Sequence, residues 1–193
     1  MNKIVLATSN KNKVIEINQI VKGKIEFISL DSLGFEGEIP EDQDTIEGNA
    51  FQKSNYIFQL YGIQTLSEDT GLFVNSLNGE PGVYTARYAK RSQSELSNTD
   101  FLLNRMKGIK DRSAYFETVF CLISIKETLY FESKCYGEIS LNPKGSEGFG
   151  YDPIFIPNGY VQTFAELDYK IKNKIGHRGL ALKQLMDYLG STI

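Results

Sequence analysis

KIVLATSNKNKVIEINQIVK, residues 3–22, is the stretch that decides the fold class of this chain. Residues 3–7 form a short apolar run, which predicts a buried β-strand. Apolar residues then recur at helical spacing and predict a helix over residues 12–22. A strand, a polar loop and a helix in this order open a βαβ unit, and sheets of this kind bind ligands at such loops. The stretch therefore predicts an α/β fold with a candidate binding loop after its first strand.

The rest of the chain continues to alternate between strand and helix patterns. Acidic, turn-rich residues 34–46 end in a capping box, Asp44-Thr45-Ile46-Glu47, which predicts a helix that Gly62 stops after Tyr61. Two β-rich runs joined by Lys126-Glu127 predict an antiparallel hairpin. The other predicted elements are strands at 25–30, 63–66 and 72–74, hairpin strands at 114–125 and 128–136, and helices at 97–106 and 180–189. We therefore expect an α/β protein with a large mixed sheet.

The overall composition is that of a soluble globular protein, with 193 residues, 41% hydrophobic and 23% charged. No apolar run approaches the about 20 residues of a membrane span, and no basic-then-apolar leader opens the sequence, so we expect a cytoplasmic protein. The net charge of −3 argues against nucleic-acid binding through a broad basic surface. A small anionic ligand remains compatible with a local group of lysines and arginines.

The cysteines and the histidine exclude several kinds of site. Cys121 and Cys135 lack metal-ligand spacing, and Cys121 lies in an apolar run, so a buried free thiol is expected rather than a disulfide. The chain has one histidine, which excludes a His-rich zinc site.

The acidic pair Glu68-Asp69 is the most informative polar feature. It follows the apolar run 63–66 and precedes Gly71, so we expect it at the end of a strand. Carboxylates there can hold a hard divalent cation or take a proton from water. Two adjacent acids are common on solvated surfaces, and these carry weight only if other polar clusters converge on them.

Residues 8–13 form the first such cluster, between the first strand and the first helix. A helix N-terminus is an anion site, to which Lys13 can add charge and Thr8 and Asn10 hydrogen bonds. The stretch has no Walker loop. Taken alone, it is also explained by N-cap residues and a solvated lysine.

Glu41 and Lys53 are further candidates for the same site. Glu41 follows Pro40 in a loop, where acids are usually solvated. Lys53 lies two turns into the predicted second helix. We expect Lys53 to be exposed unless that helix flanks a phosphate site.

An aromatic turn at residues 149–153 is a candidate for stacking on a base. Phe149 and Tyr151 alternate with glycines, and Asp152 can accept a hydrogen bond from a base edge. A tight turn with a core aromatic explains the same residues equally well.

His177-Arg178 precedes the predicted last helix, after a basic stretch at residues 170–174. Arginine gives strong, directional donation to an oxo group. Helix capping beside a solvated basic segment is the alternative.

Six motifs in this order are similar to those of the inosine/xanthosine triphosphate pyrophosphatase family, which hydrolyses non-standard purine nucleoside triphosphates. The resemblance covers nearly the whole chain. The motifs are Thr8-Ser9-Asn10 with Lys13, Glu47-Gly48-Asn49-Ala50 with Lys53, Glu68-Asp69-Thr70-Gly71-Leu72, Pro81-Gly82-Val83-Tyr84 with Ala86-Arg87-Tyr88, Gly148-Phe149-Gly150-Tyr151-Asp152-Pro153, and His177-Arg178-Gly179 with Ala181-Leu182. Glu68, Ser9 and Gly176 depart from the bacterial pattern, where Asp, Gly and Ser are usual, and none of these changes removes an assigned functional group.

The resemblance implies a single domain over residues 1–193, a two-lobed α/β fold with a long curved mixed β-sheet flanked by helices and a central active-site cleft. It implies a Mg²⁺ requirement, a homodimer, and cleavage of inosine, deoxyinosine or xanthosine triphosphate (ITP, dITP, XTP) to the monophosphate and pyrophosphate. It implies that Glu41 and Asp69 bind Mg²⁺, with Glu68 a further candidate, and that Asp69 accepts the proton of the attacking water. The implied substrate contacts are Thr8, Ser9, Asn10, Lys11, Asn12, Lys13, Lys53, Thr70, Phe149, Gly150, Tyr151, Asp152, Lys172, His177 and Arg178.

Base selection follows from the oxo group that inosine and xanthosine carry at position 6. Arg178 or Lys172 aimed at that position would donate a hydrogen bond to the oxygen, whereas the amine of adenine would face it with another donor. Guanine also carries a 6-oxo group, so this contact does not select against it. These expectations require Asp69 and Phe149 to face one crevice.

Three alternatives stay open at this point. A pyrophosphatase of modified pyrimidine or ordinary nucleotides would use similar residues. A nucleotide sensor that has lost catalysis is opposed by Glu41, Glu68 and Asp69. A nucleic-acid-binding module is opposed by the acidic balance.

Overall fold

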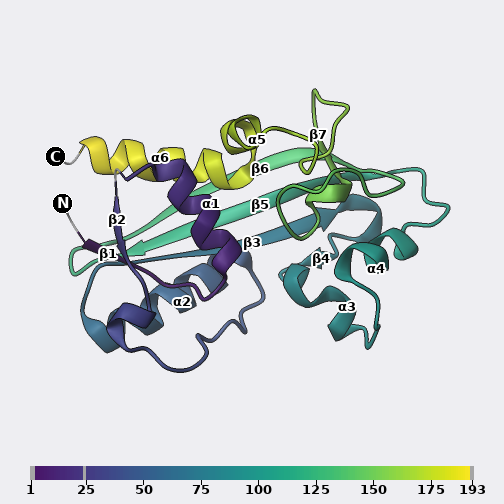
Figure 1. The fold of residues 1–193 in the computed structure, drawn as a ribbon. Helices are drawn as coiled ribbons and strands as arrows, with labels where there is room; N and C mark the ends of the chain where they lie inside the picture. Colours follow the sequence, from purple (N-terminus) through teal and green to yellow (C-terminus); the bar gives the residue numbers. More distant parts are fainter. Residues whose placement is uncertain (1–2, 24, 192–193) are drawn as a thin grey trace. The chain divides into compact units, whose positions relative to one another are not determined.

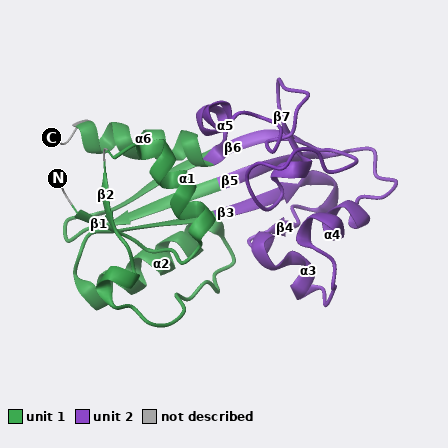
Figure 2. Cartoon of the chain, in the orientation of Figure 1, with its two compact units in different colours: residues 1–69, 118–133, 178–193 green, residues 70–117, 134–177 purple. Residues whose placement is uncertain are grey.

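The computed structural model describes residues 3–23 and 25–191, and the chain forms two compact units (Figure 2). Unit 1 comprises residues 1–69, 118–133 and 178–193, and unit 2 comprises residues 70–117 and 134–177. Three long strands, β3 (Thr65–Val74), β5 (Ser113–Ile123) and β6 (Thr128–Ile139), contribute residues to both units. The remaining elements are considered unit by unit.

The sheet has the order β2-β1-β3-β5-β6-β7, with β4 (Pro81–Gly82) paired to β3 (Figure 1). Strand β1 (Lys3–Leu6) is parallel to both β2 (Glu26–Ile28) and β3, with Val5 opposite Ile28 and Thr65. The pairs β3–β4 and β6–β7 (Phe155–Pro157) are antiparallel. The predicted α/β class with an open mixed sheet and flanking helices is confirmed.

Helices cover both faces of the sheet in unit 1. Ile4 and Leu6 of β1 pack in one core cluster with residues of α1 (Lys11–Val21) and α6 (His177–Ser191). Val5 and Ala7 point to the opposite face and pack with Ile57 of α2 (Ile46–Tyr61). This alternation follows from the two-residue period of a strand, which buries a central parallel strand on both faces.

Capping residues set the ends of these helices as the sequence predicts. Asn10 is the N-cap of α1, and its Oδ1 accepts hydrogen bonds from the backbone N–H groups of Asn12 (3.0 Å) and Lys13 (3.3 Å). Thr45 caps α2 by accepting from the N–H of Gly48 (2.9 Å). Gly62 ends α2 in the left-handed conformation, which glycine adopts without steric cost.

One large core cluster holds unit 2 together. Its members come from β3, β5, β6, α4 (Asn98–Arg105) and the 3₁₀ turn Asp152–Ile154, with Phe116 in edge contact with Phe155. The smaller elements are α3 (Tyr88–Arg91), α5 (Tyr169–Ile175) and the 3₁₀ turns Asn75–Leu77 and Thr85–Arg87. The predicted hairpin is confirmed, because β5 and β6 are neighbours joined by four residues, a length that only an antiparallel pair can use.

Two local predictions are wrong, and one helix was not predicted. Residues 68–71 are not the end of a strand and a turn but the interior of β3, because pairing to neighbouring strands outweighs the local polarity. The basic stretch at residues 170–174, to which no element was assigned, lies in helix α5, which begins where Asp168 accepts from the N–H of Lys170 (2.7 Å). His177 and Arg178 lie inside the first turn of α6 rather than before it.

Candidate active site

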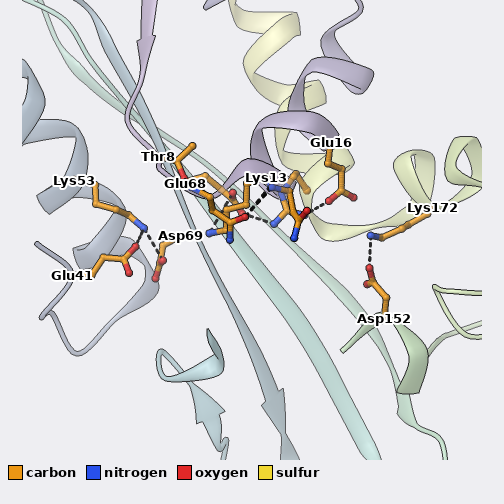
Figure 3. Close-up of polar contacts among 12 residues, drawn as sticks. Thr8, Lys13, Glu16, Glu41, Lys53, Glu68, Asp69, Asp152 and Lys172 are labelled. Atoms are coloured by element: carbon orange, nitrogen blue, oxygen red, sulfur yellow. Dashed lines mark hydrogen bonds and ion pairs between the residues drawn. The ribbon is translucent and has the colours of Figure 1, made fainter. Parts of the chain in front are cut away.

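Lys53 is held by two carboxylates in unit 1 (Figure 3). It extends from α2, is 4% exposed, and donates through Nζ to Asp69 Oδ1 (2.8 Å) and to Glu41 Oε1. Asp69 lies on β3 and is buried, whereas the Glu41 side chain is 38% exposed. Lys53 is therefore buried rather than exposed, which is the exception that the sequence analysis allowed for a helix beside the site.

Helix α2 also holds the loop that carries Glu41. The backbone N–H of Asp42 donates to Gln52 Oε1 (3.1 Å), and that of Gln43 donates to Asn49 Oδ1 (3.0 Å). Gln52 Nε2 donates in turn to Asp42 Oδ1 (2.6 Å). Asn49, Gln52 and Lys53 share one face of the helix because they are three and four positions apart. The same face thus positions the backbone and the carboxylate of this loop.

Burial and charge act in opposite directions on this cluster. Burial acts to lower the pKa of Lys53, but the attraction of Asp69 and Glu41 outweighs it, and the pKa is raised. Burial raises the pKa of Asp69, and the nearby ammonium groups of Lys53 and Lys13 offset that only in part. The two pKa directions have one explanation. Two carboxylates stabilise the charged form of Lys53, whereas Asp69 shares the single Lys53 ammonium with Glu41. Lys53 is thus kept protonated.

Glu68 and Asp69 are adjacent in β3 and therefore point to opposite faces of the sheet. Asp69 faces α2 and Lys53. Glu68, fully buried, faces α1 and α6, where Arg178 Nη2 donates to its Oε1 (2.8 Å) and Lys13 Nζ lies 3.5 Å from its Oε2. The two acids consequently have different partners and different chemistry.

The loop at residues 8–10 lies between β1 and α1, as predicted. Strand β1 ends at Leu6 opposite Leu66, and Glu68 and Asp69 lie a few residues further along β3. Ser9, Lys11 and Asn12 are exposed. Thr8 Oγ1 accepts from the N–H of Asn10 (3.2 Å), which shapes the turn into α1. The alternative of a solvated lysine does not hold for Lys13, whose side chain is largely buried beside Glu68. Burial lowers the pKa of Lys13, and the Glu68 carboxylate opposes this shift.

Glu16 is a residue that the sequence analysis missed. It is buried on α1, and Arg178 Nη1 donates to its Oε2 (2.5 Å). Arg178 is 3% exposed and thereby joins Glu16 to Glu68. A signal was present, because Glu16 is three residues after Lys13 and so shares its side of the helix.

The remaining predicted residues gather in unit 2. Asp152 Oδ2 accepts from Lys172 Nζ (2.8 Å) and from the backbone N–H of Phe149 (2.7 Å). Lys172 Nζ also lies 5.4 Å from the centre of the Phe149 ring. Gly148, at φ +76°, sits so close that a side chain there would collide with Asp152. This turn therefore fixes an aromatic ring, a carboxylate and an ammonium together.

Other predicted contacts in unit 2 have different surroundings. Tyr151 is buried and its hydroxyl donates to the Thr85 carbonyl (3.0 Å), so it is a core aromatic. The His177 ring stacks on Phe116 with centroids 4.5 Å apart. Thr70 is half-buried on β3, and Gly150 is exposed with φ +63°.

Comparison with known proteins shows the family to which this chain belongs. The Ham1 family model matches residues 4–188. The chain belongs to the Ham1 family. A dITP/XTP pyrophosphatase of Flavobacterium johnsoniae is 46% identical over 190 residues, which cover 98% of this chain and 99% of that protein. The corresponding protein of Porphyromonas gingivalis is 42% identical over 190 residues, with 98% of each chain covered.

Solved structures agree with the family assignment. The Staphylococcus aureus Ham1 protein matches with a TM-score of 0.88 and 34% identity over all of both chains. A Ham1 protein of Coxiella burnetii matches equally well, with a TM-score of 0.88 and 34% identity over 99% of this chain and 100% of that one. The resemblance inferred from the six motifs is confirmed.

In this Ham1 chain the donor set around Lys53 fits a hard divalent cation. Mg²⁺ is usually bound by one or two carboxylates together with substrate phosphates and water. Glu41 and Asp69 supply two carboxylates that already share one cationic group. Within residues 3–23 and 25–191, no larger group of acidic, histidine or cysteine side chains is arranged as a metal site.

Proposed function

We propose that this protein hydrolyses non-standard purine nucleoside triphosphates (ITP, dITP and XTP) to the nucleoside monophosphate and pyrophosphate, with Mg²⁺. The observation that carries the proposal is the pair of carboxylates, Glu41 and Asp69, converging on Lys53. The Ham1 relatives that match this chain over almost their whole length are named dITP/XTP pyrophosphatases, and these names support the substrate class.

Glu41 and Asp69 are the residues that would hold Mg²⁺. Bound there, the ion would withdraw charge from the phosphate chain and make the phosphorus easier to attack. Glu68 is less suited to this role, because Arg178 and Lys13 already neutralise its carboxylate on the other face of the sheet.

Asp69 is the proposed proton acceptor. A water molecule attacks the α-phosphorus, the bond from that phosphorus to the bridging oxygen breaks, and the proton of the water passes to the Asp69 carboxylate. In the metal-free protein burial raises the pKa of Asp69, the direction that favours proton acceptance, and a Mg²⁺ ion bound to the carboxylate would act in the opposite direction. Lys13 and Lys53 offset the charge that develops on the departing pyrophosphate, and the positive end of the α1 dipole acts in the same direction.

The turn at residues 148–152 is proposed to recognise the purine. Phe149 offers its ring for stacking, and Lys172 lies beside that ring as a donor for a 6-oxo group. Lys172 is favoured over Arg178 for this role because its ammonium, although it also donates to Asp152, lies 5.4 Å from the centre of the Phe149 ring. Arg178 instead donates through both terminal nitrogens to Glu16 and Glu68 in unit 1. An adenine amine would meet a donor instead of an acceptor and would be rejected.

A substrate panel tests the proposal. Pyrophosphate release is measured from ITP, dITP, XTP, the four ordinary ribonucleotides and modified pyrimidine triphosphates, with Mg²⁺ and with chelator. We expect fast release from the first three in Mg²⁺ alone. Release of orthophosphate, or equal rates on ATP, would contradict the assignment.

A cytoplasmic homodimer is part of the same proposal and rests on the family resemblance. Among the described residues, no helix has the length and apolar character that a membrane crossing requires. Light scattering after gel filtration would test the dimer, for which we expect twice the chain mass.

A further inference from the structure

We propose that Lys53 is a built-in cation that occupies the divalent-metal position of the metal-free protein and leaves it when a nucleotide binds. The inference rests on the proposed function, since it concerns the same two carboxylates. It assigns Lys53 two alternating partners: Glu41 and Asp69 without ligand, and phosphate oxygens with ligand. Metal and nucleotide binding would then be coupled through one side chain.

The contacts of Lys53 carry the first step. Its ammonium donates to Asp69 Oδ1 at 2.8 Å and to Glu41 Oε1, so one positive charge serves both carboxylates (Figure 3). A divalent cation bound to those oxygens would bring two further charges next to a buried ammonium. Like charges in a buried site repel strongly, so Lys53 and the metal exclude each other from this position.

The carboxylates do not depend on Lys53 alone for their place, which is the second step. Asp69 is fixed by the backbone of β3. Glu41 is carried by the loop whose next two N–H groups donate to Gln52 and Asn49 of α2. These hydrogen bonds can persist when Lys53 turns away, so the metal ligands would stay assembled for the incoming ion.

A triphosphate supplies the replacement partner, which is the third step. Lysine has a flexible four-carbon stem and rotatable donors, so its ammonium can exchange one set of oxygens for another. Once Lys53 binds phosphate, the repulsion toward the metal is relieved. By linkage, nucleotide must then raise the affinity for metal by the same factor by which metal raises the affinity for nucleotide.

Removal of the Lys53 charge is the direct test. Mn²⁺ binding to the nucleotide-free protein is measured by electron paramagnetic resonance for the wild type, Lys53→Met and Lys13→Met. We expect Lys53→Met to bind Mn²⁺ about tenfold more tightly than the wild type, within the usual range for coupled sites. Lys13→Met is the comparison variant, because it also removes one cation, and that cation pairs with Glu68 and acts on Asp69 only through longer-range attraction, without a hydrogen bond to the carboxylate pair. An equal or smaller gain for Lys53→Met than for Lys13→Met would overturn the inference.

A wild-type measurement keeps the test independent of folding in the variants. Nitrogen-15 NMR of the lysine ammonium groups follows Lys53 in the intact protein, identified by the signal missing from Lys53→Met, or from Lys53→Gln if the first variant does not fold. We expect that signal to shift or broaden on addition of Mg²⁺. An unchanged signal at saturating Mg²⁺ would contradict displacement.

The proposed function and this inference can fail separately. A wild type that neither releases pyrophosphate from ITP nor binds Mn²⁺ in its presence would remove the proposed function. A wild type that releases pyrophosphate from ITP and binds Mn²⁺ in its presence would support the proposed function. If Lys53→Met then showed no gain in Mn²⁺ affinity, only the proposal that Lys53 exchanges its partners would be contradicted.

Discussion

At the scale of single residues, the partner of each carboxylate decides its role. Glu68 and Asp69 are neighbours in β3, yet one accepts from Arg178 and the other from Lys53. Glu68 is neutralised in a buried network that includes Glu16, an arrangement suited to holding three elements together. Asp69 shares its lysine with Glu41, and this leaves it available for a metal ion and a proton.

Asp69→Asn should remove catalysis while keeping the fold. An amide cannot take the proton of the attacking water, and loss of a general base typically costs about 100- to 10,000-fold in rate. The measurement is kcat for ITP, alongside thermal unfolding. Asp44→Asn, at an exposed position before α2, serves as the control and should retain the wild-type rate. Near-normal turnover in Asp69→Asn would remove Asp69 from this role.

Arg178→Ala should destabilise the protein. The substitution leaves Glu16 and Glu68 buried with an uncompensated charge, which usually costs about 3–5 kcal/mol. Urea unfolding measures the free-energy change. Arg105→Ala is the matched control, because Arg105 pairs with Glu80 and is 41% exposed, and exposed pairs contribute about 1 kcal/mol or less. Equal losses for the two variants would contradict a structural role for the Arg178 network.

At the scale of elements, helix α2 combines packing with assembly of the site. One face buries Ala50 and Ile57 in the core of unit 1. The neighbouring face presents Asn49, Gln52 and Lys53 to the loop that carries Glu41. Because one helix supplies all the side chains that bind this loop, the loop can hold the carboxylate of Glu41 in a fixed place.

Gln52→Ala should weaken metal binding more than catalysis. It removes two hydrogen bonds to residue 42, together worth about 1–3 kcal/mol, so we expect the Mg²⁺ concentration for half-maximal rate to rise by up to about 5- to 150-fold. At saturating Mg²⁺, kcat should recover. Gln59→Ala, an exposed change on the same helix, should alter neither quantity. A fall in kcat that Mg²⁺ does not rescue would argue against a positioning role for Gln52.

At the scale of the whole molecule, the candidate residues divide between the two units. The carboxylates, Lys13 and Lys53 belong to unit 1, whereas Phe149, Asp152 and Lys172 belong to unit 2. The proposed function assigns the triphosphate to the first group and the purine to the second. That both groups serve one substrate stays a prediction, and it has a kinetic consequence.

Phe149→Ala should weaken binding of the nucleoside without affecting binding of the phosphate chain. Loss of ring stacking costs about 1–3 kcal/mol per base, which is a rise of about 5- to 150-fold in KM for ITP. Inhibition by tripolyphosphate should be unchanged. Parallel losses for ITP and tripolyphosphate would show that Phe149 does not recognise the base.

The two cysteines provide a test of the native core that is independent of the site. Both are buried free thiols, as the sequence predicts, and burial raises the pKa of Cys121 to about 12 and that of Cys135 to about 11. Since the thiolate is the reactive form, native protein should react slowly with a disulfide reagent at pH 8. Because both pKa values lie well above pH 8, the small thiolate fraction, and with it the slow rate, should rise about tenfold for each pH unit within the native range. Unfolded protein should yield two thiols at once, and rapid reaction of native protein would contradict the packing.

The sequence by itself determined the local features of this protein. The opening strand, loop and helix, the cap and stop of α2, the hairpin and the buried cysteines all follow from residues a few positions apart, whose periodicity and hydrogen bonding are decided locally. Even the candidate list for the site came from types and order of residues, through similarity to one family. Strand β3 is the exception, since its polar interior is stabilised by neighbouring strands and not by its own pattern.

Tertiary structure alone decided which charges meet. Lys53 reaches Asp69 across 16 positions, and Arg178 reaches Glu68 across 110 and Glu16 across 162. No local pattern assigns partners to Glu68 and Asp69, and the spacing from Lys13 places Glu16 on a helix face without indicating Arg178, because the energy of a buried charge depends on the partner that the fold brings to it. For the same physical reason, a lysine that the sequence places on a helix surface is buried between two acids.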